Sequence, residues 1–209
     1  MTGKSKVSAQ AKNGLGAAPG EELGSAAQRD RRRRILDATL ALASKGGYDA
    51  VQMRAVAERA DVALGTLYRY FPSKIHLLVS GLAREFERAQ ERLTRSTIPG
   101  ETPAERLIFV LSRNTRMMQR DPHLTEAVVR AFMFADTSAA AEVEQVGRFM
   151  EEMFAQAMRI DEPTEHDRAV FHLIADVWMA NLVAWVTRRA SAADVAARLE
   201  LSVRLLLER

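Results

Sequence analysis

The stretch "MRAVAERADVALGTLYRYFPSK", residues 53–74, decides the fold of the N-terminal third of the chain. Its first part, 53–60, has helical periodicity and gathers one apolar face, made of Met53, Val56, Ala57 and Ala60. A second short helix is centred on "GTLYRYF", where Leu67 and Phe71 are four positions apart and share the buried face. Two short helices joined by the tight connection "DVALG", with small alanines where they approach each other, predict a helix-turn-helix.

The outward face of the second helix carries residue types that suit a DNA groove. Gly65 lets the backbone approach a phosphate or a base edge, and Thr66 can donate to a base or contact a thymine methyl group. Arg69 can pair with guanine or with a phosphate, and the hydroxyl groups of Tyr68 and Tyr70 can donate to phosphate oxygens. The alternative is that these side chains are merely exposed on an ordinary helix.

A long amphipathic helix is predicted directly after this segment. Ser73 is expected to be its N-cap, and Lys74 is expected within reach of the DNA backbone. The helix runs to about Thr94 and has one apolar side, formed by Ile75, Leu78, Leu82 and Phe86. It would connect a DNA-binding domain, 25–72, to a larger domain, 73–209.

Upstream of the quoted stretch, a helical pattern begins near "RDRRRR", residues 29–34, and is stopped by the glycines of "KGGY", 45–48. Three arginines at its start are predicted to hold phosphates or enter the minor groove: Arg31, Arg33 and Arg34. A solvated basic helix start is the alternative. Residues 1–24 have few large apolar side chains and are predicted to be a flexible tail.

Composition excludes several classes of protein. The 209 residues are 47% hydrophobic and include no cysteine, so a sizeable core is expected, while disulfides and thiolate sites are excluded. The four histidines lack metal-ligand spacing, so neither a metal nor a cofactor is expected. No apolar run approaches the roughly 18 residues that span a bilayer, and residues 1–24 do not resemble a secretory signal. A cytoplasmic protein without membrane contact is therefore expected.

The charge is distributed unevenly along the chain. Residues 1–74 contain 13 Lys and Arg against 7 Asp and Glu, whereas residues 75–209 contain 17 against 20. This asymmetry favours nucleic acid as a partner of the N-terminal part.

The rest of the chain is predicted to be helical, which makes the fold class all-α. "IPGETP", 98–103, is a break, and Thr102, Pro103 and Glu105 form a capping-box start; Asp121 with Pro122 and then Pro163 mark further starts. Helices are expected over 103–120, 122–135, 138–159, 164–189 and 192–207.

Methionines and aromatic residues cluster within these helices and indicate a ligand pocket, because methionine adapts to irregular apolar shapes. The predicted lining is Phe109, Met117, Phe132, Met133, Phe149, Met153, Trp178 and Asn181. Ordinary core packing is the alternative for each of them. The amide of Asn181 needs a partner, from protein or ligand.

The last two helices are predicted to form a homodimer face through apolar stripes that include Val177, Trp185, Leu199, Val203 and Leu206. A two-fold dimer would present two recognition helices to a near-palindromic operator in double-stranded DNA. Packing within one chain is the competing explanation.

"ILDATLALASKGGYDAVQMRAVAERADVALGTLYRYFPSKIHLL", residues 35–78, resembles the DNA-binding domain of the tetracycline-repressor (TetR) family. The resemblance implies an all-helical homodimer in which three N-terminal helices bind DNA and a C-terminal bundle binds an inducer. The DNA contacts that it implies fall on Gln52, Arg54, Gly65, Thr66, Tyr68, Arg69, Tyr70 and Lys74. Ala63 and Leu64 depart from the family pattern, which often has serine and a basic residue there.

Two further segments, "AFMFADTSAAAEVEQV" and "DVWMANLVAWVTRRASAADVAARL", resemble the KstR type of repressor of cholesterol catabolism in actinobacteria. This resemblance implies release from the operator by a sterol-derived coenzyme A thioester. A TetR-type regulator of another hydrophobic ligand is one alternative, and a helical partner module that does not bind DNA is another. An enzyme is not expected, because no nucleophile or acid–base motif is present.

Overall fold

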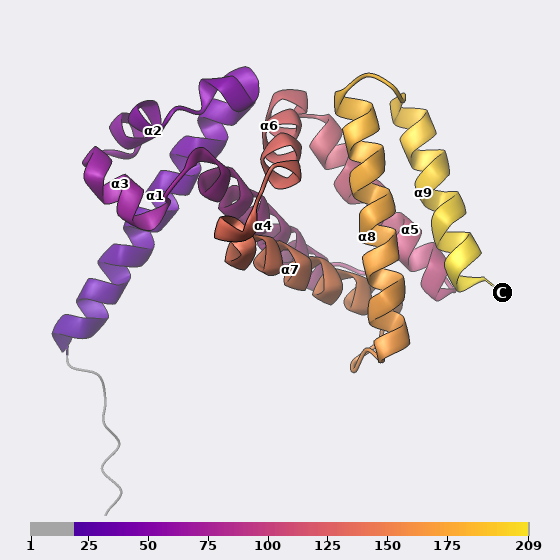
Figure 1. Cartoon of the computed structure of the whole chain (residues 1–209). Helices are drawn as coiled ribbons and strands as arrows, with labels where there is room; N and C mark the ends of the chain where they lie inside the picture. The colour runs from indigo at the N-terminus through magenta and orange to yellow at the C-terminus, as the bar shows by residue number, and fades with distance from the viewer. Residues whose placement is uncertain (1–18, 209) are drawn as a thin grey trace, which may run out of the picture.

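The computed structural model describes residues 19–208, with side chains from residue 26 onward. Over this range the chain is helical and contains no strand, which confirms the all-α class (Figure 1). The helices are α1 (Pro19–Ala50), α2 (Met53–Ala60), α3 (Leu64–Tyr70), α4 (Lys74–Thr94), α5 (Pro103–Gln119), α6 (Pro122–Met133), the short η1 (Thr137–Ala139), α7 (Ala140–Met158), α8 (Glu165–Val186) and α9 (Ala192–Leu207).

The first three helices form a lobe at one side of the molecule, and α4 leads from this lobe into the bundle (Figure 1). Within the lobe, α2 is followed by its C-cap Asp61, whose φ of 53° is left-handed, and the chain turns there towards α3. The predicted apolar faces are confirmed, since Leu67 and Phe71 are completely buried with the small and apolar residues of α2. Arg34 on α1 donates to the carbonyl of Ala60 at 2.6 Å and so secures the C-terminal end of α2.

The predicted helix stop at "KGGY" is confirmed as a sharp kink inside α1. Gly46 and Gly47 have non-helical backbone angles, and φ of Gly47 is 68°, a conformation that a side chain disfavours. At the other end, α1 already begins at Pro19, before the boundary at which the predicted tail ends. Residues 1–18 of that tail lie outside the described residues.

The predicted starts of the bundle helices are formed by caps. Thr102 and Glu105 form the expected capping box of α5, and Asp121 caps α6 by accepting from the backbone N–H of Leu124. The cap of α8 is Thr164, one residue after the expected Pro163. The prediction for Ser73 is wrong in one respect: it occupies the N-cap position of α4, but its side chain makes no cap and instead bonds His76 Nδ1 at 2.9 Å.

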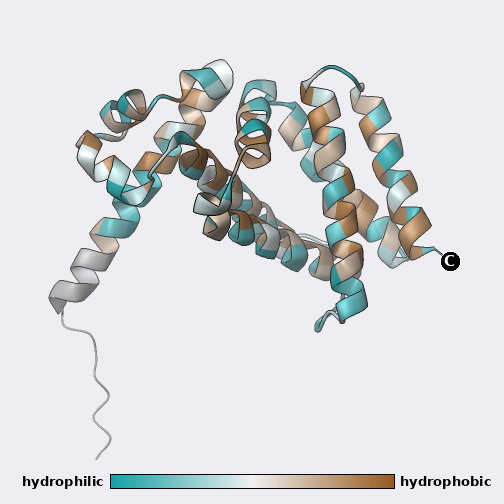
Figure 2. Ribbon diagram, viewed as in Figure 1, coloured by the Kyte–Doolittle hydropathy of each residue, from teal (hydrophilic) through white to brown (hydrophobic). Residues whose placement is uncertain are grey.

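The bundle core forms around aromatic side chains that come from three helices, α4, α7 and α8. Trp178 of α8 meets Phe86 of α4 edge to face at 5.7 Å, and Phe154 of α7 meets Phe171 of α8 in the same way at 6.0 Å. Hydrophobic positions, brown in Figure 2, alternate with hydrophilic positions along each helix, and the buried hydrophobic residues form one core cluster.

Arg106 is a buried cation that ties the start of α5 to the end of α7. It is 5% exposed and donates to the carbonyl oxygens of Ala157, Met158 and Glu101 at 3.0, 3.2 and 2.9 Å. The last carbonyl groups of a helix lack intrahelical partners, so a cation there satisfies them.

We expect Arg106→Met to lower the free energy of unfolding by about 2–3 kcal/mol, because hydrogen bonds to a charged group are lost and the carbonyl groups stay buried. Urea titration at fixed protein concentration measures the change. Arg116→Met, on the exposed side of the same helix, should change the free energy of unfolding by less than about 0.5 kcal/mol. Equal effects of the two substitutions would contradict this role of Arg106.

Candidate DNA-binding surface and ligand pocket

The outward side of α3 presents the side chains that were predicted to contact DNA. Tyr68 is 47% exposed, Arg69 is exposed, and Thr66 is half-buried. Gly65 is also exposed, and a Cβ added there would have no neighbouring heavy atom within 4 Å, so the backbone is open to a close approach. Tyr70 is half-buried, with its ring 6.5 Å from that of Phe71. These residues therefore share an accessible helix surface, and their contact with DNA stays a prediction.

The start of α2 adds two exposed polar side chains. Gln52 occupies the N-cap position but makes no capping hydrogen bond, so its amide is available to another partner. Arg54 is exposed in the first turn of the helix. Both groups can donate to phosphate oxygens.

Several predicted DNA contacts are occupied by bonds within the lobe. Lys74 is half-buried and donates to the carbonyl oxygen of Tyr48 at 3.0 Å, which argues against the predicted phosphate contact. Burial lowers the pKa of Lys74, with Asp49 opposing that shift. Arg34 holds the end of α2, whereas Arg33 is exposed beside Asp30. Arg31, on the same part of α1, is half-buried.

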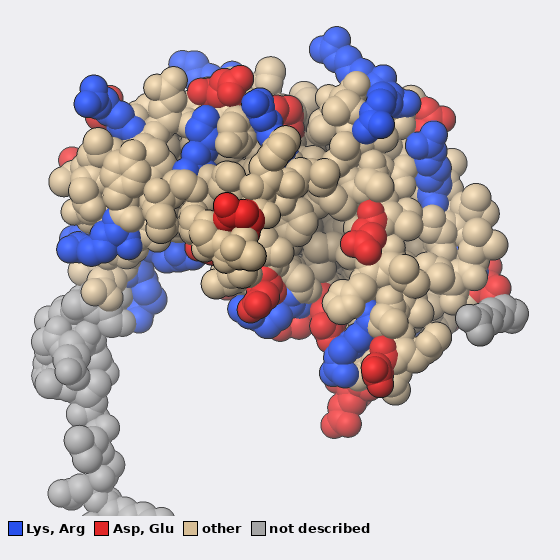
Figure 3. All heavy atoms as spheres, in the orientation of Figure 1, with Lys and Arg blue, Asp and Glu red and all other residues tan. Residues whose placement is uncertain are grey.

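Figure 3 shows Lys and Arg side chains, in blue, at the lower left over the lobe that contains α1 and α3, and a second group of them at the upper right over the end of the bundle where α8 and α9 meet. Acidic side chains, in red, are more frequent over the lower part of the bundle. The basic group over the lobe agrees with the basic N-terminal part of the sequence. A surface of this kind attracts a polyanion through its phosphates.

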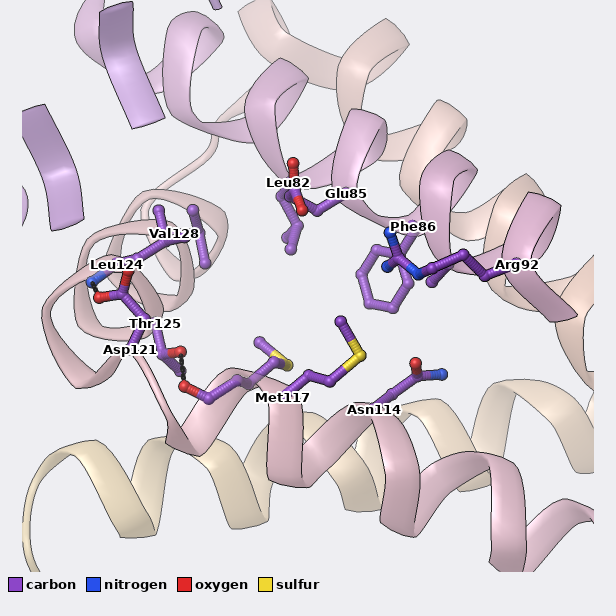
Figure 4. A pocket seen from close by; sticks show the side chains of 12 residues that line it. Leu82, Glu85, Phe86, Arg92, Asn114, Met117, Asp121, Leu124, Thr125 and Val128 are labelled. Carbon is purple, nitrogen blue, oxygen red and sulfur yellow. Dashed lines mark hydrogen bonds between the residues drawn. The ribbon is translucent and has the colours of Figure 1, made fainter. Parts of the chain in front are cut away.

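A pocket opens between α4, α5 and α6, with a cavity volume of about 120 Å³. Figure 4 shows Leu82 and Phe86 of α4 above it, Met117 of α5 below it, and Leu124 and Val128 of α6 closing one end. The walls are mostly apolar, as is typical of small-molecule sites.

Polar groups lie at the two ends of this pocket, and Glu85 of α4 lines it between them. Near α6, Thr125 donates to the carbonyl of Met118 at 2.6 Å and Asp121 caps the helix. At the other end, Arg92 and Asn114 line both the pocket and a smaller adjoining hollow, which Arg113 also lines. The arrangement suits a long apolar ligand with an anionic group at the end that Arg92 and Arg113 border.

Of the predicted pocket residues, Met117 is the one that lines this pocket. Met153 and Trp178 lie behind its wall: Met153 accepts from Asn114, and Trp178 packs on Phe86. Asn181, at 7% exposure, donates to the carbonyl of Val177 and so is satisfied within α8. The remaining four are placed outside the lining, with Met133 55% exposed: Phe109, Phe132, Met133 and Phe149.

The sequence signal failed here because a methionine or aromatic residue marks large apolar volume and does not say whether that volume is filled. The lining residues that were missed are mainly on α4 and α6, including Leu82, Leu124 and Val128. Their helical spacing predicts a buried face and is equally consistent with a filled core.

The predicted dimer face also needs correction. Leu199 and Val203 are buried within the chain, at 4% and 0% exposure, because α9 packs that side against α5 and α8. Val177, Trp185 and Leu206 are half-buried. The large apolar side chains left exposed on α8 and α9 are Leu173, Leu201 and Leu205, at 52%, 58% and 69%.

Among the described residues, α8 is the one helix that is long and apolar enough to cross a membrane by length and composition, with mean hydropathy 1.6 over its most apolar window. A third of that window is buried inside the chain, 33%. Figure 2 shows hydrophobic bands on the faces of α8 and α9 that are turned to the viewer. A helix that packs one face against its own chain and another face in a subunit interface can be as apolar as a membrane-spanning helix.

Two family models match the chain. The model described as "Bacterial regulatory proteins, tetR family" matches residues 35–80, and "Tetracyclin repressor-like, C-terminal domain" matches residues 100–206. The HTH-type transcriptional repressor KstR of Rhodococcus jostii is 68% identical over 90% of this chain and 87% of its own length. KstR of Mycobacterium tuberculosis is 62% identical over 89% of this chain and 84% of its own length.

Solved structures have the same arrangement of helices. A TetR transcriptional regulator from Rhodococcus sp. RHA1 superposes with a TM-score of 0.80 at 34% identity, over 87% of this chain and 97% of that chain. Thermus thermophilus FadR, a TetR-family repressor solved in complex with lauroyl-CoA, superposes with a TM-score of 0.62 at 23% identity, over 85% of this chain and 93% of that chain.

Proposed function

Because the chain belongs to the TetR family and is of its KstR repressor type, we propose that it represses genes of sterol and lipid catabolism by binding their operators as a homodimer in the cytoplasm. The observation that carries this proposal is the identity of 62–68% to KstR repressors over about 90% of the chain. The exposed polar side of α3 supports it, because Thr66, Tyr68 and Arg69 are available to a groove.

The pocket is the proposed inducer site. Its apolar walls suit a steroid nucleus, and Arg92 and Arg113 would hold the phosphates of a coenzyme A thioester at its mouth. The lauroyl-CoA complex of the related fold supports an acyl-CoA ligand of this kind. Asn114, which lines both hollows, would lie close to the thioester end.

Ligand binding would release the operator by linkage between the two sites. A ligand shifts the protein between two arrangements only if it binds one of them more tightly, so the DNA-free arrangement must have the higher ligand affinity. Tilting of α4, which lines the pocket and leads into the DNA-binding lobe, would change the separation of the two recognition helices. DNA and ligand must then weaken each other by the same factor.

The test of this function is a fluorescence-anisotropy titration of near-palindromic operator candidates from the source genome at two salt concentrations. It is repeated with the coenzyme A thioester of a cholesterol side-chain acid and with lauroyl-CoA. Specific binding released by the sterol thioester alone supports the whole proposal. Release by lauroyl-CoA alone supports a fatty-acid inducer, and salt-independent or absent DNA binding contradicts a repressor.

The dimer is proposed to form through the exposed apolar side of α8 and α9. Leu173, Val177, Ala180 and Ala184 of α8 share one helix side, and Leu201 and Leu205 do so on α9. These residues are accessible in the single chain, whereas Leu199 and Val203 are not.

Replacing Leu201 and Leu205 together by glutamate should therefore convert the dimer to a folded monomer. Charged groups are costly to bury in an apolar interface, and we expect the dimer Kd to rise at least about 100-fold. Sedimentation velocity measures the assembly state, and circular dichroism checks the fold. Glutamates placed at Ala140 and Ala141, exposed on α7, add the same charge and should leave the dimer intact. A dimer that survives the α9 substitutions would show that another surface holds the subunits together.

A further inference from the structure

The kink of α1 meets α6 at a cluster of polar side chains that has no part in the DNA surface or in the pocket lining. The backbone N–H of Tyr48 donates to Glu126 Oε2 at 2.9 Å. Two cations contact the ring of Tyr48, with Lys74 Nζ 4.2 Å and the Arg130 guanidinium 4.4 Å from its centroid. Arg130 also pairs with Glu126 at 3.6 Å and Asp49 at 3.7 Å. We call Tyr48, Lys74, Glu126 and Arg130 the Tyr48 clamp.

The clamp joins three elements at one point. Tyr48 belongs to the end of α1, Lys74 opens α4, and Glu126 and Arg130 lie on α6. Lys74 donates to the carbonyl oxygen of Tyr48, so both backbone groups of this residue are held from other helices. A shift of α6 relative to α4 must therefore move or break a bond to the α1 kink.

The α1 kink and Glu126 lie too close together to leave space for a side chain at position 47. A Cβ added at Gly47 would lie 2.8 Å from Glu126 Oε2, closer than side chains tolerate, and its backbone already has a positive φ of 68°. Glycine at this position lets the carboxylate reach the backbone of the kink. In addition, α1 packs against α6 more extensively than any other pair of described helices pack together.

Helix α6 contacts the pocket with one side and the α1 kink with another. Leu124, Thr125 and Val128 line the pocket, while Glu126 and Arg130, four positions apart, point to the α1 kink. Figure 4 shows that α6 closes one end of the pocket, so a ligand that extends to this end must contact it. With only 12 residues, α6 is short enough to shift as one body.

We propose that the Tyr48 clamp transmits ligand occupancy from α6 to the DNA-binding lobe, with Glu126 and Arg130 as positioning residues that contact neither ligand nor DNA. This inference rests on the proposed function. A ligand that displaces α6 pulls Glu126 from the α1 kink or carries the kink with it, and in both cases the lobe that holds α3 changes its position on the bundle. Without the clamp, ligand still binds, but the lobe follows the movement of α6 less.

The test is the coupling between operator and ligand in Glu126→Ala. Ligand affinity is measured by calorimetry with the coenzyme A thioester of a cholesterol side-chain acid, with and without operator DNA. We expect affinity in the absence of DNA to stay within about twofold of the parent, because Glu126 does not line the pocket. The factor by which operator weakens the thioester should fall at least about tenfold, or 1.4 kcal/mol of coupling.

Two variants separate transmission from general damage. Glu126→Gln keeps an oxygen that can accept from Tyr48 N–H and should retain more coupling than Glu126→Ala. Glu151→Ala removes a comparable surface partner, that of Arg168 at 2.9 Å between α7 and α8, and should keep full coupling. Thermal melts at fixed concentration verify that each variant is folded.

The outcomes distinguish this inference from the proposed function. If the parent shows coupling and Glu126→Ala shows the same coupling, the clamp does not transmit and the proposed function stands. If the parent binds operator with no effect of the thioester, both the inducer assignment and the clamp are overturned. Loss of coupling in Glu126→Ala and in Glu151→Ala alike would also contradict a specific role of the clamp.

Discussion

Arg69→Ala is expected to cause the largest loss of operator affinity among single substitutions in α3. One arginine contact to a guanine edge contributes about 1–3 kcal/mol, and a two-fold dimer loses it in both half-sites, so the expected loss is roughly 2–6 kcal/mol. Arg69 is exposed, and the buried Leu67 and Phe71 fix the side of the helix from which it projects. The fold should therefore be unaffected.

The measurement is anisotropy with operator and with a scrambled duplex over a series of salt concentrations. A base contact predicts that discrimination between the two duplexes falls, whereas a phosphate contact predicts a uniform loss and a smaller salt slope. Arg148→Ala, an exposed arginine on α7, is the matched control and should leave the affinity within about twofold. If the two variants bind operator equally well, α3 is not the recognition helix.

The second large effect is expected at Trp178, which supports the pocket from behind. Trp178 is 1% exposed, its indole N–H donates to Thr115 Oγ1 at 2.9 Å, and its ring packs on Phe86. Trp178→Ala should lower the free energy of unfolding by about 3–5 kcal/mol, through lost burial and the cavity that remains. Because Phe86 lines the pocket, ligand affinity should fall as well.

Trp178→Phe separates the contribution of ring packing from that of the hydrogen bond to Thr115. It keeps a ring against Phe86 but leaves the hydroxyl of Thr115 without its donor, for an expected loss of about 1–3 kcal/mol. Urea titrations must be compared at one protein concentration, because dimerisation contributes to apparent stability. A cost of less than about 1 kcal/mol for Trp178→Ala would show that the wall of the pocket does not depend on this side chain.

Local features of the fold could be predicted because their signals are short. The capping box of Thr102 and Glu105, the cap at Asp121 and the glycine kink at 46–47 each depend on residues within a few positions of one another. The pairing of Leu67 with Phe71 follows in the same way from helical spacing. Ser73 is an instructive exception, since His76 from the next turn competes for its hydroxyl.

The positions of the functional surfaces were harder to predict, because an apolar stripe looks the same in sequence whatever covers it. Leu199 and Val203 have the spacing of an interface but are covered by their own chain, and the neighbouring Leu201 and Leu205 are left exposed. Lys74 lies shortly after the recognition helix α3 in the sequence. Its ammonium group nevertheless donates to the carbonyl oxygen of Tyr48, 26 positions away.

The sequence by itself determined the all-α class, the helix-turn-helix with its outward polar side, the starts of α5 and α6, and the family. These features are encoded in adjacent residues, or in patterns shared along the chain with known repressors. Only the tertiary structure decided where the pocket lies, which side of α9 stays exposed and how Glu126 reaches the α1 kink 78 positions away. These features depend on which distant helices pack together and on the volume that they leave unfilled, and periodicity within one helix carries no information about either.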